Sequence, residues 1–279
     1  VNNRQGYSSK MVEKQAIKKK YLFGPVASRR LGLSLGIDLV PHKTCSLNCV
    51  YCESGQSTCL TAQRAEYVPT SEVIQQLDDF LSGSPELDYL TFSGAGEPTL
   101  HSGIGEIIEF CKSKYPQYRI CLLTNASMFS DSKLRREISR VDLICPSLDA
   151  SSEEEFEKIN RPAPGITFQS LVGGLKIFRA SSEAEYRLEL FIVPGINDSE
   201  ASIERFVALI REIAPDLVQL NTLDRPGCVD WIRASAPENT MRFVKALEPY
   251  VRVEAIGPFK YRSEAPKQQL PEAEIDHRI

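Results

Sequence analysis

Short apolar runs rich in β-branched residues alternate with longer segments of helical period from about residue 33 onward. This alternation is typical of a parallel sheet whose strands are joined by crossover helices. The predicted strands are 33–40, 89–93, 119–124, 143–147, 187–193 and 217–221, with 251–256 as an additional candidate. The predicted helices are 72–81, 105–114, 133–140, 153–158, 168–179, 199–213 and 238–247. Helix N-caps are expected at Ser71, Asp131, Ser152 and Ser199.

Six βα units are two fewer than a closed eight-stranded barrel needs. We therefore predict an α/β fold: a partial (βα)6 TIM-like barrel with parallel strands, open laterally. The predicted organisation is an N-terminal extension (1–20), one barrel domain (21–260) and a C-terminal tail (261–279). In such folds functional residues gather at the carboxyl ends of the strands, so the residues just after each strand are the ones to inspect.

Composition and charge narrow the functional classes. The chain has 279 residues, of which 42% are hydrophobic and 25% charged, enough apolar material for one large core. Its formal net charge of −4 provides no global positive field, which argues against a nucleic-acid partner. A local basic patch at Lys18–Lys20 with Arg29 and Arg30 keeps nucleic acid as a weaker alternative. No apolar run approaches the roughly 18 residues of a membrane-spanning helix, and no signal-peptide core precedes the barrel, so we expect no membrane association and a cytoplasmic protein.

Eight cysteines in a reducing compartment should be thiols, and three of them cluster after the first predicted strand. Cys45, Cys49 and Cys52 have the spacing C-x3-C-x2-C. Three thiolates on a short loop can each bind one iron of a 4Fe-4S cubane and leave the fourth iron open. The alternative is structural zinc, since His42 completes a formal Cys3His ligand set. Only one C-x2-C pair is present, which favours the cluster.

This spacing, with the aromatic Tyr51 before the last cysteine, resembles the hallmark of the radical S-adenosylmethionine (SAM) superfamily. The segment 94–98, Gly-Ala-Gly-Glu-Pro, resembles the Gly-Gly-Glu motif of that superfamily, with alanine in place of its first glycine. Segments 124–125, 147–149 and 193–198 match recurring family positions in order and spacing. The resemblance covers about residues 21–228.

The resemblance implies that the open iron chelates SAM, and that reductive cleavage yields a 5′-deoxyadenosyl radical that abstracts hydrogen from a substrate. It also implies a low-potential electron donor of the flavodoxin or ferredoxin type. By position, Glu97 and the Gly96 backbone receive the methionine ammonium, whereas Tyr51 and Ile196 line the adenine. Thr124, Asn125 and Ser147 bind the carboxylate or the ribose hydroxyls of SAM, and Asp149 supports the ribose contact. Turn, cap or core roles are the alternative for each of these residues.

Within the superfamily the chain resembles a subgroup of Fe-S oxidoreductases related to the tRNA wybutosine-synthesis enzyme, through segments 24–32, 158–162 and 218–222. That enzyme carries extra cysteines before the loop, whereas no cysteine precedes Cys45 here, which argues against the tRNA reaction. The candidates for contact with an anionic substrate are Arg29, Arg30, Arg161, Arg187, Glu189, Gln219 and Arg225.

The other five cysteines lie outside the C-x3-C-x2-C spacing. We expect Cys59, Cys111, Cys121 and Cys145 to act as small apolar residues, and we single out Cys228, after the sixth strand, as the one worth mutating. His101 receives no role. The alternatives to a small-molecule radical enzyme are a glycyl-radical-type activase acting on a partner protein, a tRNA-modifying radical SAM enzyme, and a zinc-stapled binding module without enzymatic activity.

Overall fold

One nine-stranded sheet organises the residues that the computed structural model describes, which are 21–28, 30–257 and 259–263. Its strands, in spatial order, are β1 (Leu22–Ser28), β2 (Gly32–Ile37), β5 (Tyr89–Phe92), β6 (Arg119–Thr124), β7 (Leu143–Pro146), β8 (Glu185–Phe191), β9 (Leu217–Asn221), β10 (Val253–Ala255) and β11 (Tyr261–Arg262). A separate short pair consists of β3 (Thr44–Cys45) and β4 (Cys59–Leu60). The helices are α1 (Thr70–Leu81), α2 (Ile104–Lys114), α3 (Ser132–Glu137), α4 (Glu153–Ile159), α5 (Phe168–Ser181), α6 (Glu200–Ile213) and α7 (Pro237–Leu247), with the short 3-10 helix η1 (Pro98–Leu100).

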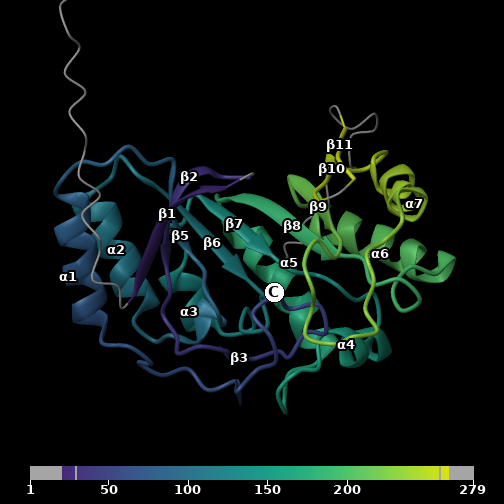
Figure 1. Cartoon of the computed structure of the whole chain (residues 1–279), viewed down its shortest axis with the longest axis horizontal. Helices are drawn as coiled ribbons and strands as arrows, with labels where there is room; N and C mark the ends of the chain where they lie inside the picture. Colours follow the sequence, from purple (N-terminus) through teal and green to yellow (C-terminus); the bar gives the residue numbers. More distant parts are fainter. Residues whose placement is uncertain (1–20, 29, 258, 264–279) are drawn as a thin grey trace, which may run out of the picture.

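The strands from β2 to β10 are all paired in parallel, as the alternation in the sequence predicts. Each connection between neighbouring parallel strands carries at least one helix, which gives six βα units. Figure 1 shows the helices on the outside of the curved sheet, with α1 and α2 near the β1 edge and α6 and α7 near the β11 edge. The predicted partial (βα)6 barrel, open laterally, is therefore confirmed.

Two antiparallel edge strands, β1 and β11, are absent from the sequence-based prediction. β1 contains Gly24 and Pro25, and its register is interrupted between Phe23 and Val26. Because proline cannot donate to a sheet ladder, it is confined to edge strands and bulges, so this segment does not carry a strand signal. β11 extends the sheet two residues into the predicted C-terminal tail. The predicted extension 1–20 and the tail residues 264–279 lie outside the described residues.

The two faces of the sheet have different partners. In β6 and β7, Ile120, Leu122 and Ile144 pack into the main core beneath the helices. The intervening residues Cys121 and Cys145 belong to a second apolar cluster on the opposite face. Because successive side chains of a strand point to opposite faces, this second face is the concave interior of the partial barrel.

Helix starts agree with the sequence at three of the four predicted N-caps. The side chains of Asp131, Ser152 and Ser199 each accept a hydrogen bond from the first turn of their helix. Ser71 is not a cap, because α1 begins one residue earlier, at Thr70. There the Glu66 carboxylate accepts the Thr70 N–H at 2.8 Å and replaces the predicted cap.

Three of the cysteines outside the loop, and His101, are buried. Cys111, Cys121 and Cys145 are buried among apolar residues, as predicted, whereas Cys59 is exposed. His101 is buried between the Val68 carbonyl and the Gly103 N–H, a structural position. Among the described residues, no helix is both long and apolar enough to cross a membrane.

Two adjacent glycines of α5 allow a matched test of this packing. A Cβ at Gly174 would lie 2.8 Å from Phe129 Cβ, whereas a Cβ at Gly173 would have no atom within 4 Å. We expect Gly173→Ala to raise the free energy of unfolding by about 0.5–1 kcal/mol, because alanine at this helix position lowers the backbone entropy of the unfolded chain. Gly174→Ala should lower it by about 1–3 kcal/mol through overpacking. Urea unfolding of both variants measures the difference, and equal effects would contradict the close approach of α5 to Phe129.

Candidate functional site

The cysteine loop lies at the carboxyl end of β2 and is held by backbone hydrogen bonds from two directions. On one side the Val50 N–H donates to the Ile159 carbonyl at 2.9 Å, and the Asn48 N–H donates to the Asn160 carbonyl at 2.8 Å. On the other side the Glu97 N–H donates to the Thr44 carbonyl at 3.1 Å. The loop is therefore fixed between the segment that follows β5 and the end of α4.

Each of the three loop thiols has a nitrogen donor directed at its sulfur. Asn125 Nδ2 lies 3.5 Å from Cys45 Sγ, Asn160 Nδ2 lies 3.3 Å from Cys49 Sγ, and Lys43 Nζ lies 3.1 Å from Cys52 Sγ. The three cysteines are free thiols and partly exposed. Burial raises the pKa of the Cys45 thiol to about 11, so a metal must displace its proton to bind at neutral pH. Donors aimed at sulfur suit thiolates that carry charge in a metal site.

The arrangement fits a multi-iron cluster better than a single zinc ion. A tetrahedral zinc needs its ligands converging on one point about 2.3 Å from each sulfur. Structural zinc sites usually have two C-x2-C-type ligand pairs, whereas the loop has one, Cys49 and Cys52. His42, the fourth member of the formal zinc set, is exposed. In a cubane each thiolate binds a different iron, so the three thiolates surround one cluster and do not meet at a single metal ion.

Gly96 permits the close approach of the segment after β5 to the cysteine loop. A Cβ at this position would lie 2.1 Å from the Thr44 carbonyl oxygen and 2.5 Å from Val40 Cγ2. Ala95, at the first glycine of the family motif, accepts the Lys43 N–H at 3.0 Å through its carbonyl. The second glycine is thus required by contact with the loop, while the first position tolerates a methyl group.

Glu97 is a buried carboxylate bonded to donors in η1 and at the end of β6. Its Oε1 accepts the Thr124 hydroxyl at 2.6 Å and both the backbone and hydroxyl of Thr99, and its Oε2 accepts the Asn125 N–H at 2.8 Å. Burial raises the pKa of this carboxyl group, and the hydrogen bonds oppose the rise. Glu97 therefore joins the ends of β5 and β6. Its contact with a methionine ammonium stays a prediction.

Asp149 plays a similar part at the ends of β7 and β8. Its carboxylate accepts the Tyr51 hydroxyl at 2.5 Å, Asn160 Nδ2 at 2.9 Å and the Phe191 N–H at 3.0 Å. Burial raises its pKa, against these three donors. The Tyr51 ring stacks on Phe191 with centroids 3.9 Å apart. Through Asn160, this network reaches Cys49.

Of the other predicted SAM-binding residues, Ile196 is partly buried and packs against the same buried apolar cluster as Tyr51 and Phe191. No described residue forms a hydrogen bond with the Ser147 hydroxyl, although the Ser147 N–H donates to the Thr124 carbonyl at 3.0 Å. These placements are compatible with the predicted adenine and ribose contacts, which stay predictions.

The predicted substrate-contact residues separate into two groups. Arg30, Arg187 and Gln219 belong to the concave interior, where Arg30 pairs with Glu189. Arg225 instead pairs with Glu53 at 3.3 Å, next to the cysteine loop, and both side chains are exposed. The Arg161 carbonyl accepts the Asn48 N–H at 3.2 Å, which places Arg161 beside the same loop. Arg29 lies outside the described residues.

Two residues at the site, Lys43 and Asn160, were not assigned from the sequence. Lys43 and Asn160 both donate to cysteine sulfurs, and Asn160 Oδ1 is buried without a partner among the described residues. Asn160 falls within the segment 158–162 that resembles a subgroup motif, so the sequence contained a signal for it. Cys228 Sγ lies 3.1 Å from the Cys49 carbonyl, which places the singled-out cysteine against the loop.

Comparison with known proteins identifies related sequences. The sequence model described as "Radical SAM superfamily" matches residues 39–210. A protein named GTPase Obg from Brachyspira hyodysenteriae is 37% identical over 88% of this chain, which spans only 36% of that protein's length. A UPF0026 protein from Synechocystis is 35% identical, covering 74% of this chain and 76% of that protein. A GTP 3′,8-cyclase from Chlorobaculum tepidum is 29% identical, covering 60% of this chain and 47% of that protein.

Solved structures show the same fold at low identity. A radical SAM methyltransferase from Sphaerobacter thermophilus superposes with a TM-score of 0.62 at 18% identity, covering 80% of this chain and 66% of that chain. SuiB from Streptococcus suis bound to S-adenosylmethionine gives a TM-score of 0.55 at 15% identity, covering 75% of this chain and 46% of that chain. The relationship to the tRNA wybutosine-synthesis enzyme stays a prediction.

The Tyr51–Asp149 hydrogen bond can be tested by a matched pair of Tyr→Phe changes. Tyr51→Phe keeps the ring on Phe191 but removes one of three donors to a buried carboxylate. We expect the free energy of unfolding to fall by about 1–3 kcal/mol. Tyr67→Phe removes a hydroxyl that bonds the Gln63 carbonyl at an exposed site, and should change it little. Urea unfolding compares the two, and equal small losses would mean that Asp149 does not depend on Tyr51.

Proposed function

The chain belongs to the radical SAM superfamily, and we propose that it binds a 4Fe-4S cluster through Cys45, Cys49 and Cys52 and cleaves S-adenosylmethionine reductively. The observation that supports this most directly is the loop itself: three free, partly exposed thiols, each with a nitrogen donor at its sulfur, at the carboxyl ends of parallel strands. When bound, such a cluster supplies the electron that converts SAM to methionine and a 5′-deoxyadenosyl radical, which abstracts hydrogen from the substrate.

The residues of the chain would hold the reactants in place. Asn125, Asn160 and Lys43 donate to the three sulfurs and stabilise their negative charge. Gly96 allows the segment after β5 to approach the loop, and we propose that its backbone meets the methionine end of SAM. Glu97 fixes the turn at Thr124 and Asn125, so it positions these residues.

We propose that the rest of SAM extends over the ends of β7 and β8. The free hydroxyl of Ser147 and the polar group of Asn125 would bind its carboxylate or ribose, with Asp149 acting through Tyr51 and Asn160. The apolar surface of Tyr51 and Ile196 would exclude water from the adenine. Superfamily members need a reductant, and we propose a low-potential donor of the flavodoxin or ferredoxin type.

Each alternative function predicts a different experimental result. A zinc-stapled module predicts one zinc per chain and no SAM cleavage, and the single C-x2-C pair and the exposed His42 disfavour it. A glycyl-radical-type activase predicts transfer of the radical to a partner polypeptide, and a tRNA-modifying enzyme predicts modified nucleosides after incubation with tRNA. The net charge of −4 disfavours the last of these.

The experiment that tests the proposal compares two cysteine variants. After anaerobic reconstitution with iron and sulfide, we expect four irons per chain and formation of 5′-deoxyadenosine on reduction with dithionite in the presence of SAM. Cys49→Ala should lose the cluster and at least about 100-fold of this activity, because one thiolate ligand is missing. Iron analysis and chromatography of the nucleoside measure both.

The matched control is Cys59→Ala, since Cys59 is exposed outside the three-cysteine spacing. It should retain the iron and the activity of the unmodified chain. Zinc in place of iron, or equal activity in both variants, would refute the cluster assignment.

We expect Asn160 to affect the midpoint potential of the cluster but not its assembly. The reduced cluster carries one more negative charge, so the Asn160 N–H directed at Cys49 Sγ stabilises the reduced form more than the oxidised form. We expect Asn160→Leu to keep four irons but to shift the midpoint potential to a more negative value. Asn239→Leu, on α7, is the control and should not shift it. A spectroscopically monitored redox titration decides, and an unchanged potential in Asn160→Leu would contradict the role.

A further inference from the structure

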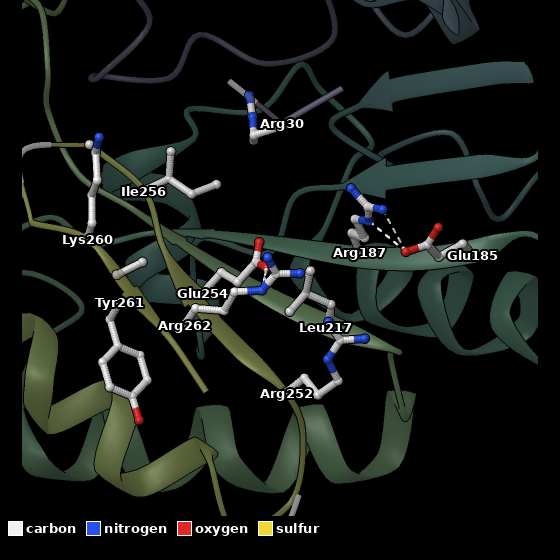
Figure 2. A pocket seen from close by; sticks show the side chains of 12 residues that line it. Arg30, Glu185, Arg187, Leu217, Arg252, Glu254, Ile256, Lys260, Tyr261 and Arg262 are labelled. Atoms are coloured by element: carbon white, nitrogen blue, oxygen red, sulfur yellow. Dashed lines mark hydrogen bonds and ion pairs between the residues drawn. The ribbon is translucent and has the colours of Figure 1, made fainter. Parts of the chain in front are cut away.

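A cavity of about 620 Å³ lies between the two edges of the sheet. Arg30, in the turn between β1 and β2, lines it from one edge, and Lys260, Tyr261 and Arg262 line it from the β11 edge. Residues of β8, β9 and β10 form the wall between these edges. The cavity therefore opens where the partial barrel is not closed. Figure 2 shows Arg30, Lys260 and Glu254 around the same hollow.

The cavity is positively charged. Five basic and two acidic side chains line it: Arg30, Arg187, Arg252, Lys260 and Arg262, with Glu185 and Glu254.

Ion pairs compensate three of the cations. Arg187 pairs with Glu185 at 2.7 Å and Arg262 with Glu254 at 2.9 Å, as Figure 2 shows by dashed lines. Arg30 pairs with Glu189, which lies deeper in the interior.

Arg252 and Lys260 have no acidic partner within residues 21–28, 30–257 and 259–263, and both are exposed. Two uncompensated cations on one cavity favour an anion with about two negative charges, such as a phosphoryl group.

A buried amide that is bonded to Glu254, a residue of the cavity wall, lacks a hydrogen-bond donor. Gln219 is 1% exposed and lies in register between Glu189 and Glu254 on the neighbouring strands. Its Nε2 donates to Glu254 Oε2 at 3.3 Å, while its Oε1 has no partner among the described residues. A buried carbonyl without a donor costs about 1–3 kcal/mol, so a group that brought an N–H or O–H to Oε1 would be stabilised there.

Strand geometry connects the cavity to the cysteine loop. Phe191, Glu189 and Arg187 point to the same face of β8, because alternate residues of the strand belong to the main core. Phe191 contacts Tyr51 beside the cysteine loop. A strand rises about 3.3 Å per residue, which puts Arg187 about 13 Å from Phe191 along β8. A molecule the size of a nucleotide or a sugar phosphate spans this distance.

We propose that this cavity binds the substrate and that the substrate is a phosphorylated small molecule. Its phosphoryl group binds Arg252 and Lys260, with Arg187 beside them, and its other end donates a hydrogen bond to Gln219 Oε1 while facing the SAM site. The proposal rests on the proposed function, since it names the substrate class of the same enzyme.

The first test uses pyrophosphate as the probe and the anaerobically reconstituted full chain. We expect saturable binding by isothermal titration calorimetry. Arg252→Gln combined with Lys260→Gln should weaken it at least about tenfold, because two charge-assisted contacts are lost. Lys245→Gln, an exposed lysine of α7 outside the cavity, is the charge-matched control and should stay within about twofold of the unmodified chain. Absence of binding, or equal affinity in the double variant, would overturn the proposal.

The second test distinguishes the two sources of a phosphoryl group. Ribose 5-phosphate and GMP are titrated in the same way against the unmodified chain and Gln219→Met, which keeps the volume but removes the amide. At least one of the two compounds should bind tighter than inorganic phosphate, whose charge is similar, and lose that gain in Gln219→Met. The compound that does so identifies a sugar phosphate or a nucleotide. If neither gains over inorganic phosphate, Gln219 does not contact the ligand and that part of the proposal fails.

Formation of 5′-deoxyadenosine by the unmodified chain is measured in parallel. Its absence would refute the proposed function, while the pyrophosphate titration would still decide whether the cavity binds phosphoryl groups.

Discussion

The cysteine loop depends on hydrogen bonds that it receives from its surroundings, because its only regular elements are the short strands β3 and β4. Val50 and Asn48 are bonded to the end of α4, and Thr44 is bonded to Glu97. These partners come from two separate βα units, those of β5 and β7, and the parallel register of the sheet brings them to one edge with the loop. Any change that shifts one strand end relative to another would therefore displace the thiols.

Two buried carboxylates hold the segments around the cysteine loop in fixed positions. Glu97 and Asp149 are each bonded to protein donors, and burial raises the pKa of both. A buried charge is tolerated only when its hydrogen-bonding capacity is met, so each carboxylate imposes a fixed geometry on its donors. Glu97 orders the turn that carries Asn125, and Asp149 orders Tyr51 and Asn160. Both residues match family positions in the sequence, but their contacts in this structure explain them first as residues that position others.

The parallel core and the cysteine spacing could be predicted from sequence, because both are encoded in short contiguous segments. Strand 119–124 is an apolar run buried at most positions, and its bounds agree with β6 exactly as predicted. The β1 edge strand was missed because Gly24 and Pro25 carry turn signals, and the α1 cap was missed because Glu66 is outside the usual cap position. Lys43 and Asn160 could not be derived from spacing, since their contacts with cysteine sulfurs exist only after the loop folds back.

The charge distribution separates the surface from the interior. The chain carries a net charge of −4, so its outer field repels large polyanions, yet the cavity at the barrel opening has an excess of basic side chains. A concave site with walls of low dielectric concentrates its local potential, which attracts a small anion that can enter. The same arrangement disfavours a nucleic acid, whose phosphates must meet an extended positive face. A positive hollow within an acidic protein therefore selects by size as well as by charge, and this selection is consistent with a small phosphorylated molecule held in front of the cysteine loop.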